Sequence, residues 1–483
     1  MHRHVCTRLL TTQRLEKPAG VTVGHAGRSR ESAAYAETCQ DAACAQGSIR
    51  APSGALPHRL RMSAVPLERP HRFASPLTAQ KSWSPQAGSR VDNAIRRFAP
   101  EFAQIKSTAA ARETEGEQPD AAIAGLVEQG FGRLSVPREF GGDGLLPSEV
   151  LAVLVALARA DSNIAHAFRP HVNAIESAFL SQDANTNWIY AQAAQGRIFG
   201  SGSNERHGAV SRVSSTITRS PSGDRVLNGT KYFTTGSLFA DWTSASGVTE
   251  DGTVEVFFVP TDAPGVTVHP DWGGFGQRGS GSGSITFAGV RLDEATTRRV
   301  EQQATGVQEV IFAFWQLVLL AVEVGIAQSA VDDAVAYVRA RDHNFSHGLS
   351  ASPAEDPVIQ SVIGEASSLA FSAESAFAHV TRLYDQVHGI PTDSPEYPAA
   401  LTRLSLSVFQ AQAVIVDATL AVTTKIFDVG GATEIERRSA LDRHWRNART
   451  VAQHNPHRFR VREVGSTLLT DSEPDYGWGR PGQ

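Results

Sequence analysis

The chain has 483 residues, with 45 lysines and arginines against 50 aspartates and glutamates, so its formal charge is −5. This balance argues against a dedicated nucleic-acid binder, and the 41% hydrophobic and 20% charged residues are typical of a globular protein with two or three domains. The most apolar stretch, residues 310–324, contains Gln316 and Glu323 and is shorter than the ~20 residues that a bilayer requires. We therefore expect a buried helix there, no membrane association and a cytoplasmic protein.

The N-terminal segment differs in composition from the rest of the chain. Residues 1–61 contain all three cysteines, one of the 36 aromatic residues and a net charge of +5, whereas the remainder carries −10. Such a segment has little apolar surface with which to build a core. A targeting peptide and a disordered leader before a start at Met62 are the alternatives. The glycines and Pro18, which would interrupt an amphipathic helix, favour the leader.

Residues 1–88 are therefore assigned to a leader and an extended lead-in, and the rest of the sequence contains no cysteine. This excludes disulfides, zinc–thiolate sites and cysteine nucleophiles from its chemistry. His343 and His347 have no third clustered ligand and stand beside a glycine- and serine-containing loop, so we expect no metal site.

Hydrophobic periodicity predicts an N-terminal helical domain over residues 89–197. Apolar residues recur every three or four positions over residues 91–102, and a second amphipathic stretch covers residues 121–129. Residues 150–160 are apolar on nearly all sides, which indicates a buried helix. Residues 161–163, Asp-Ser-Asn, provide a break and a new helix cap.

In the next domain, residues 198–300, hydrophobic residues alternate with a period of two. Residues 210–217, 226–233 and 254–259 are rich in β-branched and aromatic side chains, and residues 220–224 form a strong hairpin-turn signal. The sequence therefore predicts a β domain in the middle of the chain.

The third domain, residues 301–470, is predicted to be helical, with residues 471–483 as a tail. Four long segments separated by Gly, Pro, Asp and Ser breaks are expected as helices: residues 307–341, 356–388, 396–428 and 439–454. Long helices joined in this way favour an up-and-down bundle. The helical, β, helical order predicts an α+β protein.

One loop, residues 274–279, matches the G-x-G-x-x-G pattern of dinucleotide-binding proteins, but its context contradicts that interpretation. A dinucleotide loop follows a strand and opens a helix, whereas this one precedes a predicted strand at residues 284–287. Its glycines and serines still offer donors for a phosphate or a flavin edge. The sequence shows no catalytic triad, paired carboxylates or P-loop, and His166 and His171 are each expected to be structural on spacing alone.

Three motifs carry a resemblance to a known family: NGTKYFTTG at residues 228–236, DWGGFGQR at residues 271–278 and DRHWRNARTVAQHNP at residues 442–456. They resemble the flavin monooxygenase branch of the acyl-CoA dehydrogenase fold, typified by the dibenzothiophene monooxygenase family. The resemblance covers residues 90–470. It implies an N-terminal helical domain, a middle β-barrel or sandwich domain and a C-terminal four-helix bundle.

One position, Asn455, distinguishes the two activities found on this fold. In acyl-CoA dehydrogenases, a glutamate near the end of this helix removes the α-proton of the substrate, and the resemblance places Asn455 there. An amide cannot accept that proton at neutral pH. Simple dehydrogenation is therefore disfavoured. An FAD-dependent acyl-CoA dehydrogenase with a base relocated to another helix is the alternative.

The resemblance implies roles for individual residues. His454 corresponds to a proton donor or a peroxide stabiliser in oxygen activation, and Thr235 to a neighbour of the reactive part of the flavin. His171 resembles a pocket histidine, and Asn455 completes the set of catalytic candidates. The cofactor-binding candidates are Ser201, Ser203, Trp272, Ser282, Arg339 and Arg341.

The implied activity is oxygenation of a sulfur or nitrogen centre of a small organic substrate by O2 and a reduced flavin. FMN is the cofactor that the resemblance favours, with FAD possible. Because the sequence offers no credible nicotinamide site, a separate flavin reductase would supply the reduced FMN. The resemblance also implies a homo-oligomer, usually a tetramer, in which subunits share a flavin site.

Overall fold

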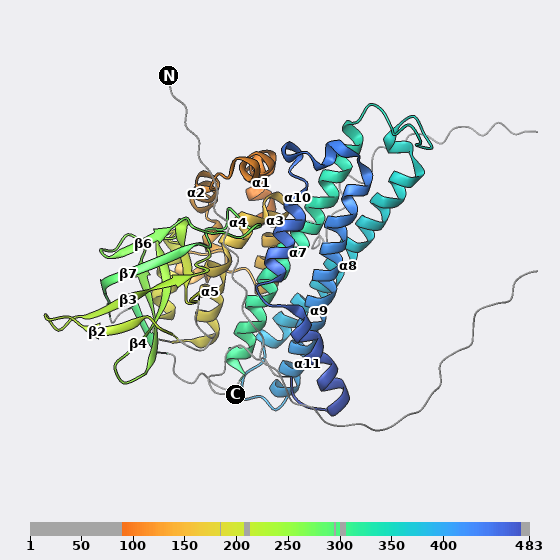
Figure 1. Ribbon diagram of the computed structural model, residues 1–483. Helices are drawn as coiled ribbons and strands as arrows, with labels where there is room; N and C mark the ends of the chain where they lie inside the picture. The colour runs from red at the N-terminus through yellow and green to blue at the C-terminus, as the bar shows by residue number, and fades with distance from the viewer. Residues whose placement is uncertain (1–88, 184, 207–212, 294–295, 300–305, 475–483) are drawn as a thin grey trace, which may run out of the picture. The chain divides into compact units, whose positions relative to one another are not determined.

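The structure, a computed structural model, describes residues 89–183, 185–206, 213–293, 296–299 and 306–474. The expected leader, and residues 475–483 of the expected tail, lie outside the described residues. In chain order the described elements are the helices α1–α6, a β-sheet and the helices α7–α11 (Figure 1). The predicted α+β architecture is confirmed.

Short and medium-length helices form the N-terminal part, as the periodicity predicted. They are α1 (Arg90–Glu115), α2 (Asp120–Glu128), α3 (Pro147–Ala160), α4 (Ser162–Ala167), α5 (Arg169–Ser181) and α6 (Thr186–Ala194), with the 3-10 turns η1 (Phe131–Arg133) and η2 (Arg138–Phe140). The predicted cap is present at α4, where the Asp161 carboxylate accepts from the Asn163 backbone N–H at 2.9 Å. Pro170 stands in the first turn of α5, where a missing N–H costs nothing.

An eight-stranded sheet forms the middle of the chain. Its strands are β1 (Phe199–Gly202), β2 (Thr216–Arg219), β3 (Arg225–Tyr232), β4 (Trp242–Val248), β5 (Val254–Pro260), β6 (Val266–His269), β7 (Ser284–Arg291) and β8 (Thr297–Arg299), with the turn η3 (Ser237–Phe239) between β3 and β4. The order is β6-β7-β3-β2-β4-β5-β8, and β1 pairs in parallel with β4. The predicted hairpin joins β2 to β3, where Gly223 has a φ of +87°.

Two strand predictions need correction. The strand expected at residues 210–217 is β2, which begins only at Thr216, and residues 207–212 lie outside the described residues. The strands β1, β4, β6 and β8 were not predicted. The sequence of β4, WTSASGV, is rich in small residues and has few of the β-branched side chains that mark a strand.

Long helices form the C-terminal part. They are α7 (Val307–Ala340), α8 (Pro357–His388), α9 (Tyr397–Lys425), α10 (Asp442–Ala452) and α11 (His457–Thr470), with the 3-10 turns η5 (Pro353–Glu355), η6 (Ile426–Val429), η7 (Ala432–Ile435) and η8 (Arg437–Ser439). The first three predicted helices are confirmed within a few residues. The fourth is shorter than predicted, and α11 after Pro456 was not predicted, because its sequence has no clear apolar stripe.

Helix α7 is the centre of the core. It is longer than the apolar stretch seen in the sequence, and its most apolar window is 89% buried inside the protein. The helices α7 and α9 are long and apolar enough to cross a membrane by length and composition, so burial, and not length, identifies α7 as a core helix. One apolar cluster joins α1, α3 and α7–α10, and the β-sheet has a core of its own. A further cluster packs Phe199 of β1 and Phe258 of β5 against α5 and α6.

The backbones of α3 and α7 approach closely at Gly325. A Cβ built there would lie 2.3 Å from the Ala158 Cβ, and both residues are in the buried part of the core. No side chain larger than hydrogen fits without moving one helix.

We predict that Gly325→Ala lowers the free energy of unfolding by ~1–3 kcal/mol, because it overpacks this contact. Gly364→Ala on α8 is the matched control, since a Cβ there meets nothing within 4 Å. That control should be neutral, or more stable by up to ~1 kcal/mol. Urea unfolding followed by circular dichroism measures both changes, and equal stabilities of the two variants would contradict the prediction.

Candidate active site

A chain of buried hydroxyl groups lies between the turn after β3 and the loop before β7. Thr235 Oγ1 and Ser282 Oγ are 2.9 Å apart, and Ser282 Oγ is 2.7 Å from Ser280 Oγ. Ser280 donates its hydroxyl hydrogen to the Gln277 carbonyl oxygen at 2.7 Å. The structure therefore brings together two predicted site residues, Thr235 and Ser282, and fixes the orientation of their hydroxyls.

The two predicted serines of the β1 region lie beside this chain. The Ser201 backbone N–H donates to the Thr235 carbonyl oxygen at 3.1 Å, and the Ser203 carbonyl oxygen accepts from Ser246 Oγ at 3.3 Å. In the part of the chain that the structure describes, neither the Ser201 nor the Ser203 hydroxyl has a hydrogen-bond partner of its own. Both hydroxyls are free to bind a ligand.

Aromatic side chains are exposed beside the hydroxyl chain. The Phe233 ring is 46% exposed and its centroid is 6.0 Å from that of Trp272, whose Nε1 donates to the Gly276 carbonyl oxygen at 3.0 Å. Phe233 has a φ of +60°, a left-handed conformation that is uncommon for a bulky residue. Exposed aromatic surface next to a few fixed polar groups is typical of a ligand site.

The end of α10 contributes His454. Its side chain is accessible to solvent. Desolvation by the surrounding protein lowers the pKa of the imidazole well below its usual 6.5, and the charges of Arg169 and His166 lower it further. His454 is therefore neutral at pH 7 and lies near two other basic side chains.

The two basic side chains near His454 are His166 on α4 and Arg169 on α5. Arg169 is 8% exposed, and burial lowers the pKa of its guanidinium to about 10, so it keeps its charge at neutral pH. His166 is 5% exposed, and burial, reinforced by the Arg169 charge, lowers its pKa to about 3. Sequence analysis did not identify Arg169, because an arginine at a helix start carries no distinctive pattern.

A buried glutamine joins the β-sheet domain to both helical parts. The Gln277 backbone N–H donates to Asn447 Oδ1 at 2.6 Å, and its side chain bonds Ser162 Oγ at 3.3 Å and His166 Nδ1 at 3.2 Å. Asn447 Nδ2 donates to the same Ser162 hydroxyl at 3.1 Å. Gln277 and Asn447 lie inside two of the motifs that carried the family resemblance, but their spacing alone did not reveal this contact.

His171, two residues after Arg169 on α5, is held by backbone groups. Its Nε2 contacts the Gly132 carbonyl oxygen at 2.7 Å, and its Nδ1 accepts from the Phe199 backbone N–H at 3.3 Å. Burial lowers its pKa to about 4, and the side chain is fully buried. Both ring nitrogens are therefore engaged by backbone groups, and a catalytic role for His171 stays a prediction.

Asn455 faces the bundle. Its Nδ2 donates to Gln316 Oε1 at 2.8 Å, and its carbonyl oxygen accepts from Gln412 Nε2 at 2.6 Å. These two buried contacts tie the chain segment that follows α10 to α7 and α9. Asn455 therefore fixes the position of its neighbour His454, and its direct participation in chemistry stays a prediction.

The two predicted arginines lie at the C-terminal end of α7. Arg341 donates to the Val429 carbonyl oxygen at 2.9 Å and stacks on the Phe345 ring, with its guanidinium carbon 4.7 Å from the ring centroid. Arg339 is exposed. No contact among the described residues brings either arginine to Thr235, Ser282 or Trp272.

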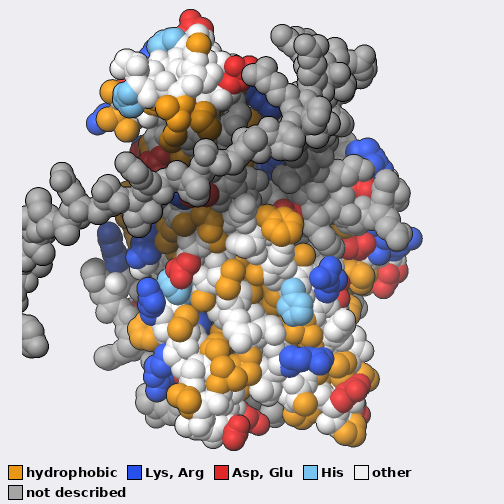
Figure 2. Space-filling model, turned by 90° about the vertical axis from the view of Figure 1, so that its right-hand side faces the viewer, with side chains coloured by type: hydrophobic (Ala, Val, Ile, Leu, Met, Phe, Trp, Pro, Cys, Tyr) orange, Lys and Arg blue, Asp and Glu red, His pale blue; other side chains and the backbone are white. Residues whose placement is uncertain are grey.

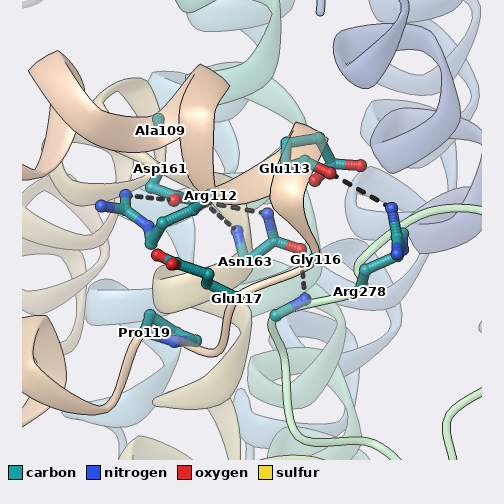
Figure 3. Close-up of a pocket in the computed structure, with 10 residues that line it drawn as sticks. Ala109, Arg112, Glu113, Gly116, Glu117, Pro119, Asp161, Asn163 and Arg278 are labelled. Carbon is teal, nitrogen blue, oxygen red and sulfur yellow. Dashed lines mark hydrogen bonds and ion pairs between the residues drawn. The ribbon is translucent and has the colours of Figure 1, made fainter.

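A small polar pocket lies beside the site and is lined by residues of α1, α4 and the loop at Gly279 (Figure 3). Asn163 Oδ1 accepts from the Gly279 backbone N–H at 3.1 Å, and Arg112 donates to Asp161 Oδ2 at 2.7 Å. Arg278 donates to the Glu113 carbonyl oxygen at 3.1 Å. These groups pair with one another, so the pocket serves to anchor the loop that carries the hydroxyl chain.

Comparison with known families matches all three parts of the fold. The N-terminal domain of acyl-CoA dehydrogenase matches residues 89–188, the middle domain residues 201–290 and the C-terminal domain residues 317–459. A dibenzothiophene monooxygenase of Rhodococcus qingshengii is 29% identical over 391 residues, which cover 77% of this chain and 92% of the relative. A probable FMNH2-dependent monooxygenase of Pseudomonas putida, SfnC, is 28% identical over 391 residues, which cover 78% and 94%.

The fold also matches a solved structure. The crystal structure of FMN-bound TdsC from Paenibacillus sp. A11-2 superposes with a TM-score of 0.72 at 25% identity, and the match covers 80% of this chain and 99% of that one. The domain matches follow one another in the same order as the helical, β and helical parts described above. The chain belongs to the acyl-CoA dehydrogenase family.

Proposed function

We propose that this protein is a flavin-dependent monooxygenase that uses reduced FMN from a separate reductase, together with O2, to oxygenate a sulfur or nitrogen centre of a small organic substrate. The observation that carries the proposal is the end of α10, where an accessible histidine, His454, adjoins an amide, Asn455, that is tied into the bundle. A relative that is a probable FMNH2-dependent monooxygenase and the FMN-bound neighbour support the same cofactor.

The residues present fit a flavin ring. The hydroxyls of Thr235 and Ser282 are fixed donors or acceptors for its polar edge, and the exposed ring of Phe233 and the half-buried ring of Trp272 can cover its apolar face. When bound, reduced FMN supplies the two electrons with which O2 is activated. The aromatic side chains exclude water from that position, which limits unproductive loss of the activated oxygen.

His454 is the residue that we assign to proton management. A neutral imidazole carries one N–H, so His454 could donate a hydrogen bond to the reacting oxygen and could return a proton when water is formed. The positive charge of Arg169 favours negative charge that develops on oxygen nearby. The buried contacts of Asn455 keep His454 in place during these changes.

The alternative, an acyl-CoA dehydrogenase with a relocated base, has less support. Glu323 on α7 is a carboxyl group on another helix, and burial raises its pKa well above the usual range. Both of its oxygens lack a hydrogen-bond partner among the described residues, but the side chain is only 1% exposed. A base must reach its substrate, so Glu323 in this position cannot act as one.

We also propose that the chain assembles into a homo-oligomer, with a tetramer as the expected state. Figure 2 views the molecule from the side on which α8 lies in Figure 1 and shows hydrophobic side chains exposed over this face. Phe371 is 67% exposed on α8, and Leu469 is 86% exposed on α11. In such an assembly Arg339 and Arg341 would bind the FMN phosphate of a neighbouring subunit, because they lie apart from the site of their own chain.

A diffusible reduced flavin requires the enzyme and its reductase to share a compartment. We therefore propose that both act in the cytoplasm.

We predict that the purified protein binds FMN and, with a flavin reductase and NADH, forms a sulfoxide or related product from an organosulfur compound in proportion to the FMNH2 consumed. Product yield and released hydrogen peroxide, measured together, give the coupling efficiency. A protein that binds FAD and whose bound oxidised flavin is bleached by an acyl-CoA without oxygen would instead be a dehydrogenase.

We predict that His454→Phe keeps FMN affinity within about threefold but lowers coupling by tenfold or more, because the proton donor is lost while the ring fills the space. FMN titration by fluorescence and the ratio of hydrogen peroxide to product measure the two effects. His343→Phe, at a histidine whose side chain is 84% exposed, is the matched control and should behave as the wild type. Unchanged coupling in His454→Phe would remove this residue from the mechanism.

We predict that Phe371→Asp weakens self-association, because a charge would have to be buried in the apolar contact. Sedimentation velocity should show a smaller species than the wild type at the same concentration. Leu349→Asp is a control at a loop residue that is 70% exposed, and it should leave the mass unchanged. A monomeric wild-type protein would contradict the proposed assembly.

A further inference from the structure

A lysine is fully buried near the end of strand β3. The side chain of Lys231 has 0% of its surface exposed, and its ammonium nitrogen donates to Glu205 Oε1 at 2.6 Å and to Ser246 Oγ at 3.1 Å. Burying an ion pair costs on the order of several kcal/mol of desolvation for each ion, so such a pair is an inefficient way to stabilise a fold. The contacts of Lys231 therefore call for an explanation other than stability.

Glu205 holds the ammonium group in place. Its carboxylate also accepts from the backbone N–H groups of Ser214 and Ser215, at 3.0 and 3.1 Å, and from the hydroxyls of both residues. Burial opposes the ionisation of Glu205, but the hydrogen bonds from Lys231 and Ser214 outweigh it and lower the pKa of this carboxyl to about 2. Glu205 is therefore a carboxylate at neutral pH and a fixed counter-ion for Lys231.

The hydroxyl of Ser246 connects Lys231 to the segment that follows β1. An ammonium group can only donate hydrogen bonds, so the Ser246 oxygen accepts from Lys231 and its single hydrogen is left to donate. This hydrogen is donated to the Ser203 carbonyl oxygen, with 3.3 Å between the two oxygens. Ser246 is only 5% exposed. The charge of Lys231 therefore sets the direction of the hydrogen bond from Ser246 to Ser203.

This bond lies where the backbone pairing of β1 ends. Strand β1 pairs in parallel with β4, and the last pair of this ladder is Gly202 with Ala245. The next two residues in the same register are Ser203 and Ser246. The Ser246 side chain therefore extends the attachment of the segment by one residue beyond the ladder.

The residues on either side of Ser203 are held by backbone contacts. The Ser201 N–H donates to the Thr235 carbonyl oxygen at 3.1 Å, and the Asn204 carbonyl oxygen accepts from the Tyr232 N–H at 2.8 Å. The hydroxyls of Ser201 and Ser203, in contrast, have no hydrogen-bond partner among the described residues. A free hydroxyl on a fixed backbone is pre-organised for binding, because little freedom is lost when a ligand arrives.

We propose that Lys231 and Ser246 are positioning residues for the cofactor site and that they act through Ser203. Lys231, held by Glu205, orients the Ser246 hydroxyl, and this hydroxyl fixes the Ser203 backbone so that the Ser203 hydroxyl is presented to the flavin. The inference rests on the proposed function, in which Ser203 is one of the cofactor contacts. Lys231 and Ser246 themselves are assigned no contact with the flavin.

The test is a double-mutant cycle on FMN binding. Ser203→Ala should weaken FMN binding about fivefold, the effect of losing one hydrogen bond, and Ser246→Ala should weaken it about twofold to fivefold. Introduced into the Ser203→Ala protein, Ser246→Ala should cause no further loss, because the hydroxyl that Ser246 positions is already absent. Fluorescence titration with FMN measures the four proteins, and circular dichroism confirms that each is folded.

A second variant on β4 is the matched control. Ser244 is half-buried on the same strand, and its hydroxyl has no hydrogen-bond partner among the described residues. Ser244→Ala should therefore bind FMN as the wild type does. In steady-state assays, Ser246→Ala should raise the KM for reduced FMN and leave kcat within about twofold, because only the binding of the cofactor is impaired.

The role of the lysine charge needs a variant in which both ions are removed. Lys231→Met alone would leave the Glu205 carboxylate buried without its partner, which destabilises the fold. We therefore expect the test from Glu205→Gln combined with Lys231→Met. This protein should bind FMN as weakly as Ser246→Ala does, and Ser203→Ala should add no further loss beyond its own effect in the wild type.

Three outcomes would overturn the proposal: unchanged FMN affinity in Ser203→Ala, unchanged affinity in Ser246→Ala, or losses in these two variants that multiply in the double variant. Multiplying losses would mean that Ser246 acts independently of Ser203. Failure of the proposed function looks different. FMN binding with the expected cycle, but without oxygenation of any organosulfur or amine compound by FMNH2 and O2, would keep the positioning residues and remove the monooxygenase.

Discussion

The buried side chain of Gln277 is the contact on which the geometry of the site depends. Gln277 is fully buried and has a left-handed φ of +54°. Its side chain bonds Ser162 and His166 in the N-terminal helical part, and its backbone N–H donates to Asn447 of α10. Burial makes each of these bonds hard to replace, because a polar group without a partner there costs the desolvation energy of that group. The loop that carries the hydroxyl chain is therefore held by both helical parts at once. The hydroxyls, the rings of Phe233 and Trp272, and the side chains of His166 and Arg169 keep fixed relative positions.

Local signals account for what could be predicted from the sequence. The long apolar periodicity of α7–α9, the Asp161 cap and the turn between β2 and β3 depend on neighbouring residues, and each is present. The strand β4 was missed because its small residues show no hydrophobic period. The helix α11 was missed because its mixture of polar and apolar residues shows none either. Periodicity predicted the helical, β, helical order, and the family resemblance assigned that order to a known fold.

The candidate site was only partly predictable. Thr235 and Ser282 are in contact, as expected of residues that share a site, and His454 is exposed at the end of its helix. Arg169 could not be found, because only the folded arrangement shows that its side chain is buried and that its Nε has no hydrogen-bond partner among the described residues. His171 was selected because it resembles a pocket histidine of the family. In the structure, backbone groups contact both of its ring nitrogens.

The close approach of α3 and α7 has a consequence for how the molecule opens. Because one apolar cluster spans the N-terminal helices and the bundle, these two parts cannot separate without exposing the shared core. The β-sheet has a core of its own, and Phe199 of β1 and Phe258 of β5 also pack in a further cluster with α5 and α6. Regions that share a core tend to exchange their amide hydrogens as one cooperative unit. We therefore expect the helices to exchange as one unit, with β1 and β5 more strongly coupled to them than β6, which packs only in the core of the sheet.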